Sequence, residues 1–267
     1  ICAHPGIAKI SLTGGVETGR LIMAQSAHSL KKITLELGGK SPLLVFDDCD
    51  FNLGVQTALD ANFYTAGEVC SNATRVFVQR SIADDFIAAL IAKAEAIRVG
   101  DPMVNNTQMG ALISARHLAK DLNYIEIGVG EGATIATGGK QLRPKGFESG
   151  YFMQPTILTN CKDNMRVVRE EIFGPVMSVL VFDDEDEAVQ RANDTDFGLG
   201  AGIITQNLAR AHRVADSLEC GNVWINSYNM TPAGLPFGGV KQSGIGVENS
   251  ANTLAAYSQI KSVFINI

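Results

Sequence analysis

The feature that most constrains this fold is a regular alternation of short apolar segments with segments of helical spacing. Residues 176–182, VMSVLVF, are apolar almost throughout rather than at every second position. A strand with that pattern is buried on both faces. Apolar strands separated by helices indicate a largely parallel sheet that is covered by helices on both sides. The sequence therefore predicts an α/β fold.

The expected elements follow one another along the whole chain. Strands are expected at 8–12, 32–37, 41–46, 74–79, 133–139, 153–160, 176–182, 201–206 and 222–226. Helices are expected at 16–30, 51–67, 81–97, 115–133, 184–195 and 207–218. Ser81 is the expected N-cap of its helix, because a hydroxyl there can accept from a free backbone N–H. No fixed-period repeat or long polar linker interrupts this order.

The composition of the chain disfavours several kinds of binding partner. The 267 residues carry a net charge of −6, which disfavours binding to nucleic acid phosphates. No apolar run approaches the ~20 residues that cross a bilayer, so no membrane partner is expected. The five cysteines form no C-x-x-C pair, which disfavours a disulfide framework or a zinc site and indicates a reducing compartment such as the cytoplasm.

Cys70 is the first candidate for chemistry. It follows a glycine by three positions, and polar Ser71 and Asn72 come before a β-branched run. A thiol attacks as a thiolate, so a nucleophilic cysteine needs a neighbouring base or a positive field. Free cysteines are often simply buried, and this window alone leaves both interpretations open.

Glu36 is the candidate base. The histidines offer no clear partner, since three fall on expected helices, where they look solvated, and the fourth lies in a terminal loop. They are His28, His117, His212 and His4. Glu36 lies inside an apolar strand just before two glycines, where burial would raise the pKa of its carboxyl toward that of a general base. A glutamate at a strand end can equally turn to solvent.

Two further segments suggest contacts with a nucleotide. Gly14 and Gly15 lie between a strand and a helix, where backbone N–H groups attract phosphate, although an ordinary βα turn has the same form. Glu171 and Phe173 precede a Gly-Pro turn. An acid there could bind a ribose diol by charge-assisted hydrogen bonds, or it could simply end a helix.

The segment 236–249, PFGGVKQSGIGVEN, is dense in glycine and carries Phe237 and Glu248. Such a loop can approach a ligand or another backbone closely. A flexible surface loop would have a similar composition.

Taken in order, these segments resemble the motif set of the NAD(P)-dependent aldehyde dehydrogenase superfamily. The motifs are LTGGVETGR, LELGGKSP, GEVCSN, EEIFGPV and PFGGVKQSG, and the similarity runs from Ile7 to the end of the chain. The separation of 34 positions between Glu36 and Cys70 also matches the family. Longer stretches, including the ending YSQIKSVFINI, are most similar to the betaine aldehyde dehydrogenase branch.

The resemblance implies a role for each matching residue. The catalytic residues would be Cys70 as nucleophile, Glu36 as general base and Glu248 as a proton-relay acid. The cofactor-binding residues would be Thr13, Gly14 and Gly15 at the pyrophosphate, Leu37, Gly38 and Phe173 at the nicotinamide, and Glu171 at its ribose. Phe237 would lie in the substrate tunnel, where an aromatic ring can hold a trimethylammonium group.

The implied reaction oxidises an aldehyde to its acid with NAD, or with NADP as the alternative cofactor, and betaine aldehyde would give glycine betaine. Cys70 would form a thiohemiacetal and then a thioester, which water activated by Glu36 would hydrolyse. A semialdehyde or an aminoaldehyde is the alternative substrate. A cofactor-free thiol hydrolase and a non-catalytic chain that only assembles with partners are alternative functions.

Family members are much longer, and this sequence begins with Ile1 and lacks the P-W-N segment that carries their oxyanion asparagine. We therefore expect a piece of a larger protein that alone binds NAD weakly and turns over poorly. Its expected parts are the tail of a cofactor domain at 1–38, a catalytic domain at 39–242 and a returning segment at 243–267. The last strand of that segment would pair with a partner subunit in a homodimer or homotetramer.

Overall fold

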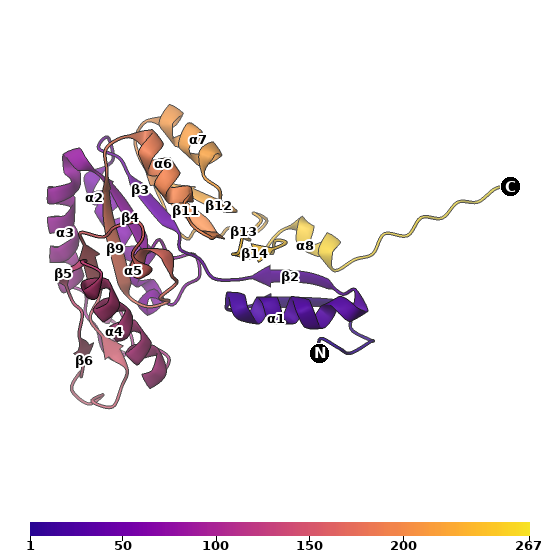
Figure 1. Ribbon diagram of the computed structural model, residues 1–267, viewed down its shortest axis with the longest axis horizontal. Helices are drawn as coiled ribbons and strands as arrows, with labels where there is room; N and C mark the ends of the chain where they lie inside the picture. The colour runs from indigo at the N-terminus through magenta and orange to yellow at the C-terminus, as the bar shows by residue number, and fades with distance from the viewer.

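The computed structural model describes residues 1–267, and a seven-stranded sheet forms the larger of its two parts (Figure 1). The strand order is β12-β11-β3-β4-β9-β8-β5. Every neighbouring pair from β12 to β8 is parallel, and only the edge strand β5 runs antiparallel to its neighbour. The strands are β3 (Pro42–Val45), β4 (Arg75–Gln79), β5 (Thr134–Thr137), β8 (Thr156–Thr159), β9 (Val176–Phe182), β11 (Gly200–Ile204) and β12 (Asn222–Ile225). The predicted α/β fold is confirmed.

Helices cover both faces of this sheet. They are α2 (Phe51–Phe63), α3 (Ala83–Glu95), α4 (Ala115–Gly130), α5 (Arg166–Arg169), α6 (Glu185–Asn193) and α7 (Leu208–Ser217). Helices α2 and α3 pack against each other, and so do α6 and α7. Helix α2 connects β3 to β4 in one direction across the sheet, whereas α6 and α7 connect β9 to β11 and β11 to β12 in the opposite direction. Because such parallel crossovers are right-handed, α2 lies on one face of the sheet and α6 and α7 lie on the other. One cluster of 42 buried apolar residues forms the core between these layers.

The smaller part is a three-stranded sheet that lies beside the larger one (Figure 1). Strands β1 (Lys9–Thr13) and β2 (Lys32–Glu36) are parallel, and β14 (Gly244–Ile245) returns from the far end of the sequence to pair with β2. Helix α1 (Val16–Ser26) connects β1 to β2 and buries only Gly19 and Ser26. This part therefore brings an early strand, β1, and a late strand, β14, together on either side of the strand that ends at Glu36.

Short elements complete the chain. They are η1 (Ala27–Ser29), η2 (Tyr64–Gly67), η3 (Arg80–Ile82), β6 (Gln141–Leu142), β7 (Phe152–Met153), β10 (Phe197–Gly198), β13 (Val240–Lys241) and α8 (Ala251–Ala256). The predicted N-cap Ser81 is wrong. It lies in η3, its hydroxyl donates to Asp47 Oδ2 at 3.0 Å, and α3 begins after Ile82 without a side-chain cap. None of the helices combines the length and apolar character required to cross a bilayer.

The last residues form an exposed extended tail. The chain after α8 runs away from the body of the molecule (Figure 1) and forms no strand with any part of this chain. Ile260, Phe264 and Ile267 are almost completely exposed there. The expected pairing of this segment with a partner subunit stays a prediction.

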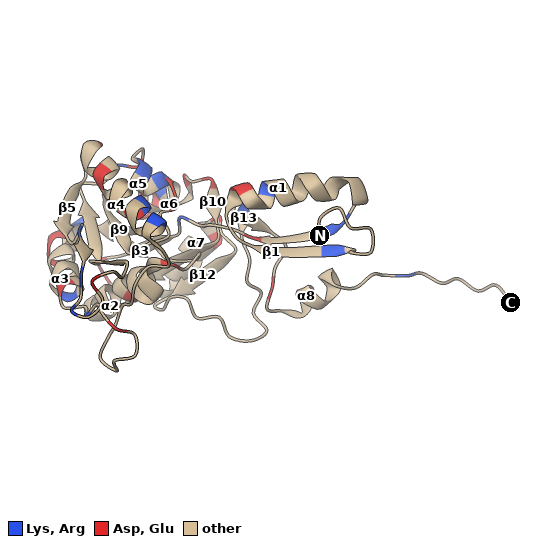
Figure 2. Cartoon of the chain, turned by 90° about the horizontal axis from the view of Figure 1, so that it is seen from below, with Lys and Arg blue, Asp and Glu red and all other residues tan.

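Several charged side chains on α6 and α7 form ion pairs. Basic and acidic positions lie close together on α6 in Figure 2. Arg191 contacts both Glu187 and Asp163, at 2.6 and 2.9 Å. Glu185 joins α6 to Arg213 on α7 at 3.0 Å. These pairs tie the two helices together at the surface, where each is worth little on its own.

Candidate active site

The segment from Glu36 to Gly39 connects the two sheets and is the centre of the site. Gly39 N–H donates to Glu171 Oε1 at 3.1 Å. A Cβ on Gly38 would overlap Glu171 Oε2, and one on Gly39 would lie 2.6 Å from the carbonyl oxygen of Cys70. The two glycines therefore let both Glu171 and Cys70 approach this backbone closely.

Cys70 is half-buried in the loop between η2 and β4. Its backbone N–H donates to no backbone carbonyl of another residue. Burial raises the pKa of the Cys70 thiol, and the nearby carboxyls of Glu171 and Glu36 raise it further. Two contacts hold the loop: Tyr228 Oη donates to the carbonyl of Ser71 at 2.9 Å, and Ser71 Oγ donates to Asn229 Oδ1 at 2.6 Å. The thiol thus lies in a loop that is fixed by hydrogen bonds, with the carboxyls of Glu171 and Glu36 nearby. This arrangement is the one expected for a nucleophile that has a base in the same site.

Glu36 is buried rather than turned to solvent. Only 6% of its surface is exposed, and neither carboxylate oxygen has a hydrogen-bond partner. Burial, and secondly the charge of Glu248, raises its pKa to about 7. Ser243 contacts the two residues that come after Glu36: its hydroxyl donates to the Gly38 carbonyl at 2.7 Å, and its carbonyl accepts from Leu37 N–H at 2.8 Å.

Glu248 and Phe237 occupy facing positions of one loop. They exchange backbone hydrogen bonds at 2.7 and 3.0 Å, and Glu248 Oε1 accepts from Ser11 Oγ at 2.9 Å. Phe237 lines a groove of about 320 Å³ together with Trp224. Neither Cys70 nor Glu36 lines that groove, so a contact between Phe237 and the substrate stays a prediction.

Thr13, Gly14 and Gly15 form the turn from β1 to α1. Thr13 lies opposite Glu36 in the strand register, and Gly14 N–H donates to the Glu36 carbonyl at 3.0 Å. Gly15 is the N-cap of α1, no side chain caps it, and a Cβ there would meet nothing within 4 Å. The start of α1 therefore has no side-chain cap and has open space beside Gly15, close to the end of the strand that carries Glu36.

Glu171 and Phe173 lie on the loop 170–175, between α5 and β9. Burial raises the pKa of Glu171, and only its Oε1 is engaged by the protein. Phe173 adopts a left-handed backbone conformation, with φ of 59°. His117 Nε2 lies 2.6 Å from the Phe173 carbonyl oxygen, and 13% of the His117 side chain is exposed. The prediction that His117 is solvated is therefore wrong, because it packs under this loop.

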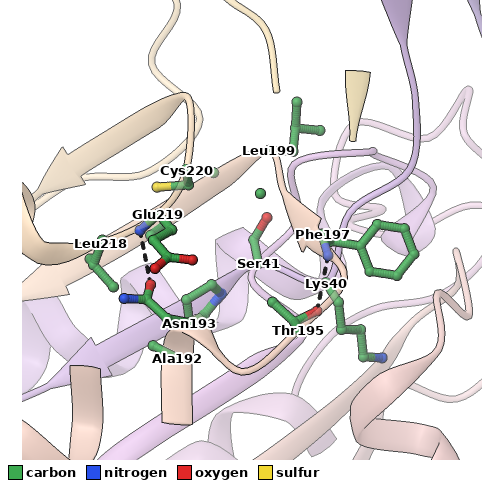
Figure 3. A pocket seen from close by; sticks show the side chains of 14 residues that line it. Lys40, Ser41, Ala192, Asn193, Thr195, Phe197, Leu199, Leu218, Glu219 and Cys220 are labelled. Carbon is green, nitrogen blue, oxygen red and sulfur yellow. Dashed lines mark hydrogen bonds between the residues drawn. The ribbon is translucent and has the colours of Figure 1, made fainter. Parts of the chain in front are cut away.

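Lys40 and Asp121 are among the buried charged residues that were not predicted. Lys40 is fully buried beside Arg75, and its burial lowers the pKa of its ammonium to about 7. It borders a tight crevice of about 10 Å³, but its amine points away from Asn193 and Glu219 in that crevice (Figure 3). Asp121 is buried on α4. The position of Asp121 could have been suspected from the sequence, because polar residues at spacings of three and four lie on one face of a helix. The residues on this face are His117, Lys120, Asp121 and Tyr124.

The fold and these residues together define a class of protein. The chain belongs to the aldehyde dehydrogenase family, whose sequence pattern matches residues 1–263. The betaine aldehyde dehydrogenases of Brucella anthropi and Brucella ovis are each 53% identical over 264 residues, which is 99% of this chain and 54% of each relative. The betaine aldehyde dehydrogenase of Staphylococcus aureus, solved in complex with NAD+, superimposes with a TM-score of 0.94 at 44% identity and covers 96% of this chain.

The resemblance drawn from the motifs is thereby confirmed. The chain spans about half the length of the curated relatives that it matches. It also covers about half of the Staphylococcus aureus chain.

Proposed function

We propose that this chain provides the nucleophile and the base of an NAD-dependent aldehyde dehydrogenase whose substrate is betaine aldehyde. The observation that carries the proposal is the meeting of Cys70, Glu36 and Glu171 around one short segment. The activity would belong to a protein in which the counterpart of the relatives' other half is also present. In this proposal residues 1–38 complete a cofactor domain, 39–242 form the catalytic domain and 243–267 return to the first part.

The residues of this chain fit a nicotinamide dinucleotide. The N-terminus of α1 has no side-chain cap, and a Cβ on its N-cap Gly15 would meet nothing within 4 Å, which suits a pyrophosphate. Glu171 has one carboxylate oxygen anchored by Gly39 N–H and the other unengaged, which suits a ribose hydroxyl. The cofactor, NAD or alternatively NADP, would supply the hydride acceptor.

Cys70 and Glu36 would divide the remaining chemistry. Glu36, with a pKa of about 7, can accept the thiol proton of Cys70, whose own pKa is raised. The resulting thiolate adds to the aldehyde carbon, and the backbone N–H of Cys70 can donate to the oxygen that becomes charged. Once Glu36 has passed that proton to solvent and the hydride has left, Glu36 takes a proton from water, and the hydroxide displaces the Cys70 thiolate from the thioester to give the acid.

A groove next to the cysteine loop supports a cationic substrate. It has a volume of about 520 Å³, and its lining includes Asp60, Tyr64, Tyr228 and Asn229. The last two residues also hold the loop that carries Cys70. Aromatic faces and a carboxylate attract the trimethylammonium group of betaine aldehyde. An anionic semialdehyde would be repelled by Asp60, so an uncharged or cationic aminoaldehyde is the stronger alternative substrate.

The proposal also includes the oligomeric state of the protein and its location in the cell. The exposed apolar tail after α8 would pair with a second copy in a homodimer or homotetramer. All five cysteines are free, which supports a cytoplasmic location.

The test measures NADH formation from betaine aldehyde and from an aminoaldehyde, both with this chain and with the longer protein that contains it. We expect little turnover by the chain alone and turnover by the longer protein that Cys70→Ala abolishes. Cys49→Ala is the matched control, because Cys49 is also half-buried but lies away from the site. Ester hydrolysis that needs Cys70 without any NADH formation would instead indicate a thiol hydrolase. Aldehyde oxidation that survives Cys70→Ala would overturn the mechanism.

A further inference from the structure

Asp121 is a buried carboxyl that the proposed chemistry does not use. It has no exposed surface, and neither of its oxygens has a hydrogen-bond partner. A Cβ on Gly174 would overlap Asp121 Oδ2, so the backbone of the loop 170–175 lies directly over this carboxyl. Its polar contacts are long: Lys120 Nζ lies 3.5 Å from Oδ1 as an ion pair, and the imidazole nitrogen His117 Nε2 lies 3.6 Å from the same oxygen.

The same loop also contacts the loop that carries Cys70. Gly67, three residues before Cys70, has a φ of 77°, and a Cβ there would overlap the Gly174 carbonyl. His117 forms a second connection, since its Nε2 lies 2.6 Å from the Phe173 carbonyl and its Nδ1 lies 3.5 Å from Glu68 Oε1. Gly174 is therefore held between Asp121 on one side and the cysteine loop on the other.

We infer that Asp121 is a positioning residue, which holds the loop 170–175 against the site when its carboxyl is neutral and releases it when the carboxyl ionises. The pH-dependent opening of the loop does not depend on the proposed function. Only the statement that this loop contributes to cofactor binding rests on it. The physical reason is that an ionised carboxylate held only by long contacts to Lys120 and His117 is costly to bury, and opening of the loop would let water reach it.

The groups around Asp121 decide where it titrates. Burial raises its pKa to about 7, Lys120 lowers it and Glu68 raises it again. The charged and titratable groups that face this region are His117, Lys120 and Tyr124 on α4, Glu170 and Glu171 on the loop, Arg166 on α5, and Glu68 next to the cysteine.

The sign of the pH dependence follows from this raised pKa. The closed loop retains a proton that the open, solvated carboxyl loses above its ordinary value of 3.8. The closed state is therefore favoured at low pH, and the advantage is lost as pH rises through about 7. If opening fully solvates the carboxyl, the population of the open loop increases about tenfold between pH 6 and pH 8.

Hydrogen exchange of the 267-residue chain, followed by mass spectrometry without cofactor at pH 6, 7 and 8, tests this. Once rates are corrected for the intrinsic effect of pH, we expect exchange at residues 172–176 to accelerate about tenfold in the wild-type chain. Asp121→Asn keeps the shape of the side chain and should remove the acceleration. Glu126→Gln removes a carboxyl from an exposed position of the same helix and should leave it unchanged.

Exchange at residues 172–176 that is independent of pH in the wild-type chain would overturn the inference, even if Asp121→Asn did not fold. Equal acceleration in wild type and Asp121→Asn would overturn it as well, and so would a change spread evenly over β9 and α2, which would indicate a purely structural role. The proposed function fails separately: the longer protein would then bind no NADH in a fluorescence titration, whatever the loop does.

Discussion

Replacement of Glu36 by glutamine removes one buried carboxyl and preserves the shape of the side chain. Burial and Glu248 raise the pKa of this carboxyl from 4.5 to about 7, so the folded chain retains a proton that the unfolded chain has lost. The folded state is therefore favoured most below pH 4.5 and loses stability as the pH rises toward about 7. Glu36→Gln should remove this loss.

The size of the effect follows from the shift. A rise from 4.5 to about 7 corresponds to ~3 kcal/mol of unfolding free energy once Glu36 is fully ionised. The carboxyl is not completely enclosed, so solvent screens part of this cost and a realistic value is ~1–2 kcal/mol. The gain of Glu36→Gln over wild type should therefore be small at pH 5 and reach ~1–2 kcal/mol at pH 8.

Urea unfolding of wild type and Glu36→Gln at pH 5, 6, 7 and 8 measures this difference. Glu17→Gln is the control, because Glu17 belongs to the same small part of the fold but is 81% exposed, and its variant should differ little from wild type. A gain for Glu36→Gln that is constant across the pH range would refute the reasoning, and so would a loss of stability that grows with pH.

Three further variants test other parts of the site. Glu248→Gln should lower the pH at which Glu36 titrates, and an unchanged midpoint in the same urea series would contradict the coupling. Gly67→Ala forces a Cβ onto the Gly174 carbonyl at a left-handed position and should destabilise the chain by ~1–3 kcal/mol; an unchanged Tm would argue against that packing. Lys40→Met should gain stability over wild type as the pH falls from 10 toward 7, because the folded chain resists protonation of Lys40 until about pH 7. A gain in urea unfolding that shrinks over this range would count against it.

The elements of the fold could be predicted because their signals are local. The expected strand 176–182 is β9 with the same bounds, and the glycine pair after Glu36 does separate two strands. A continuous apolar run can only be buried on both faces, whichever strands become its neighbours. The order of the motifs also singled out Cys70, Glu36 and Glu171, which the structure brings together.

Misses arose where a distant segment decides the environment of a residue. The helix that carries His117 was predicted, but the loop 170–175 covers its polar face, and nothing near His117 in the sequence shows this. Asp121 was missed for the same reason. Ser81 has the residue type of an N-cap, but Asp47 accepts its hydroxyl hydrogen bond and a short η3 turn precedes the helix.

The sequence by itself determined the α/β architecture and the family, and it selected the candidates for the reactive side chains, because these depend on residue type and spacing. Only the tertiary structure decided the protonation behaviour of those side chains. Glu36 could have faced solvent, and it is instead enclosed by the return of β14 and placed within the field of Glu248. A pKa depends on the dielectric surroundings and charges that surround a group in space, and here those come from residues more than two hundred positions away in the chain.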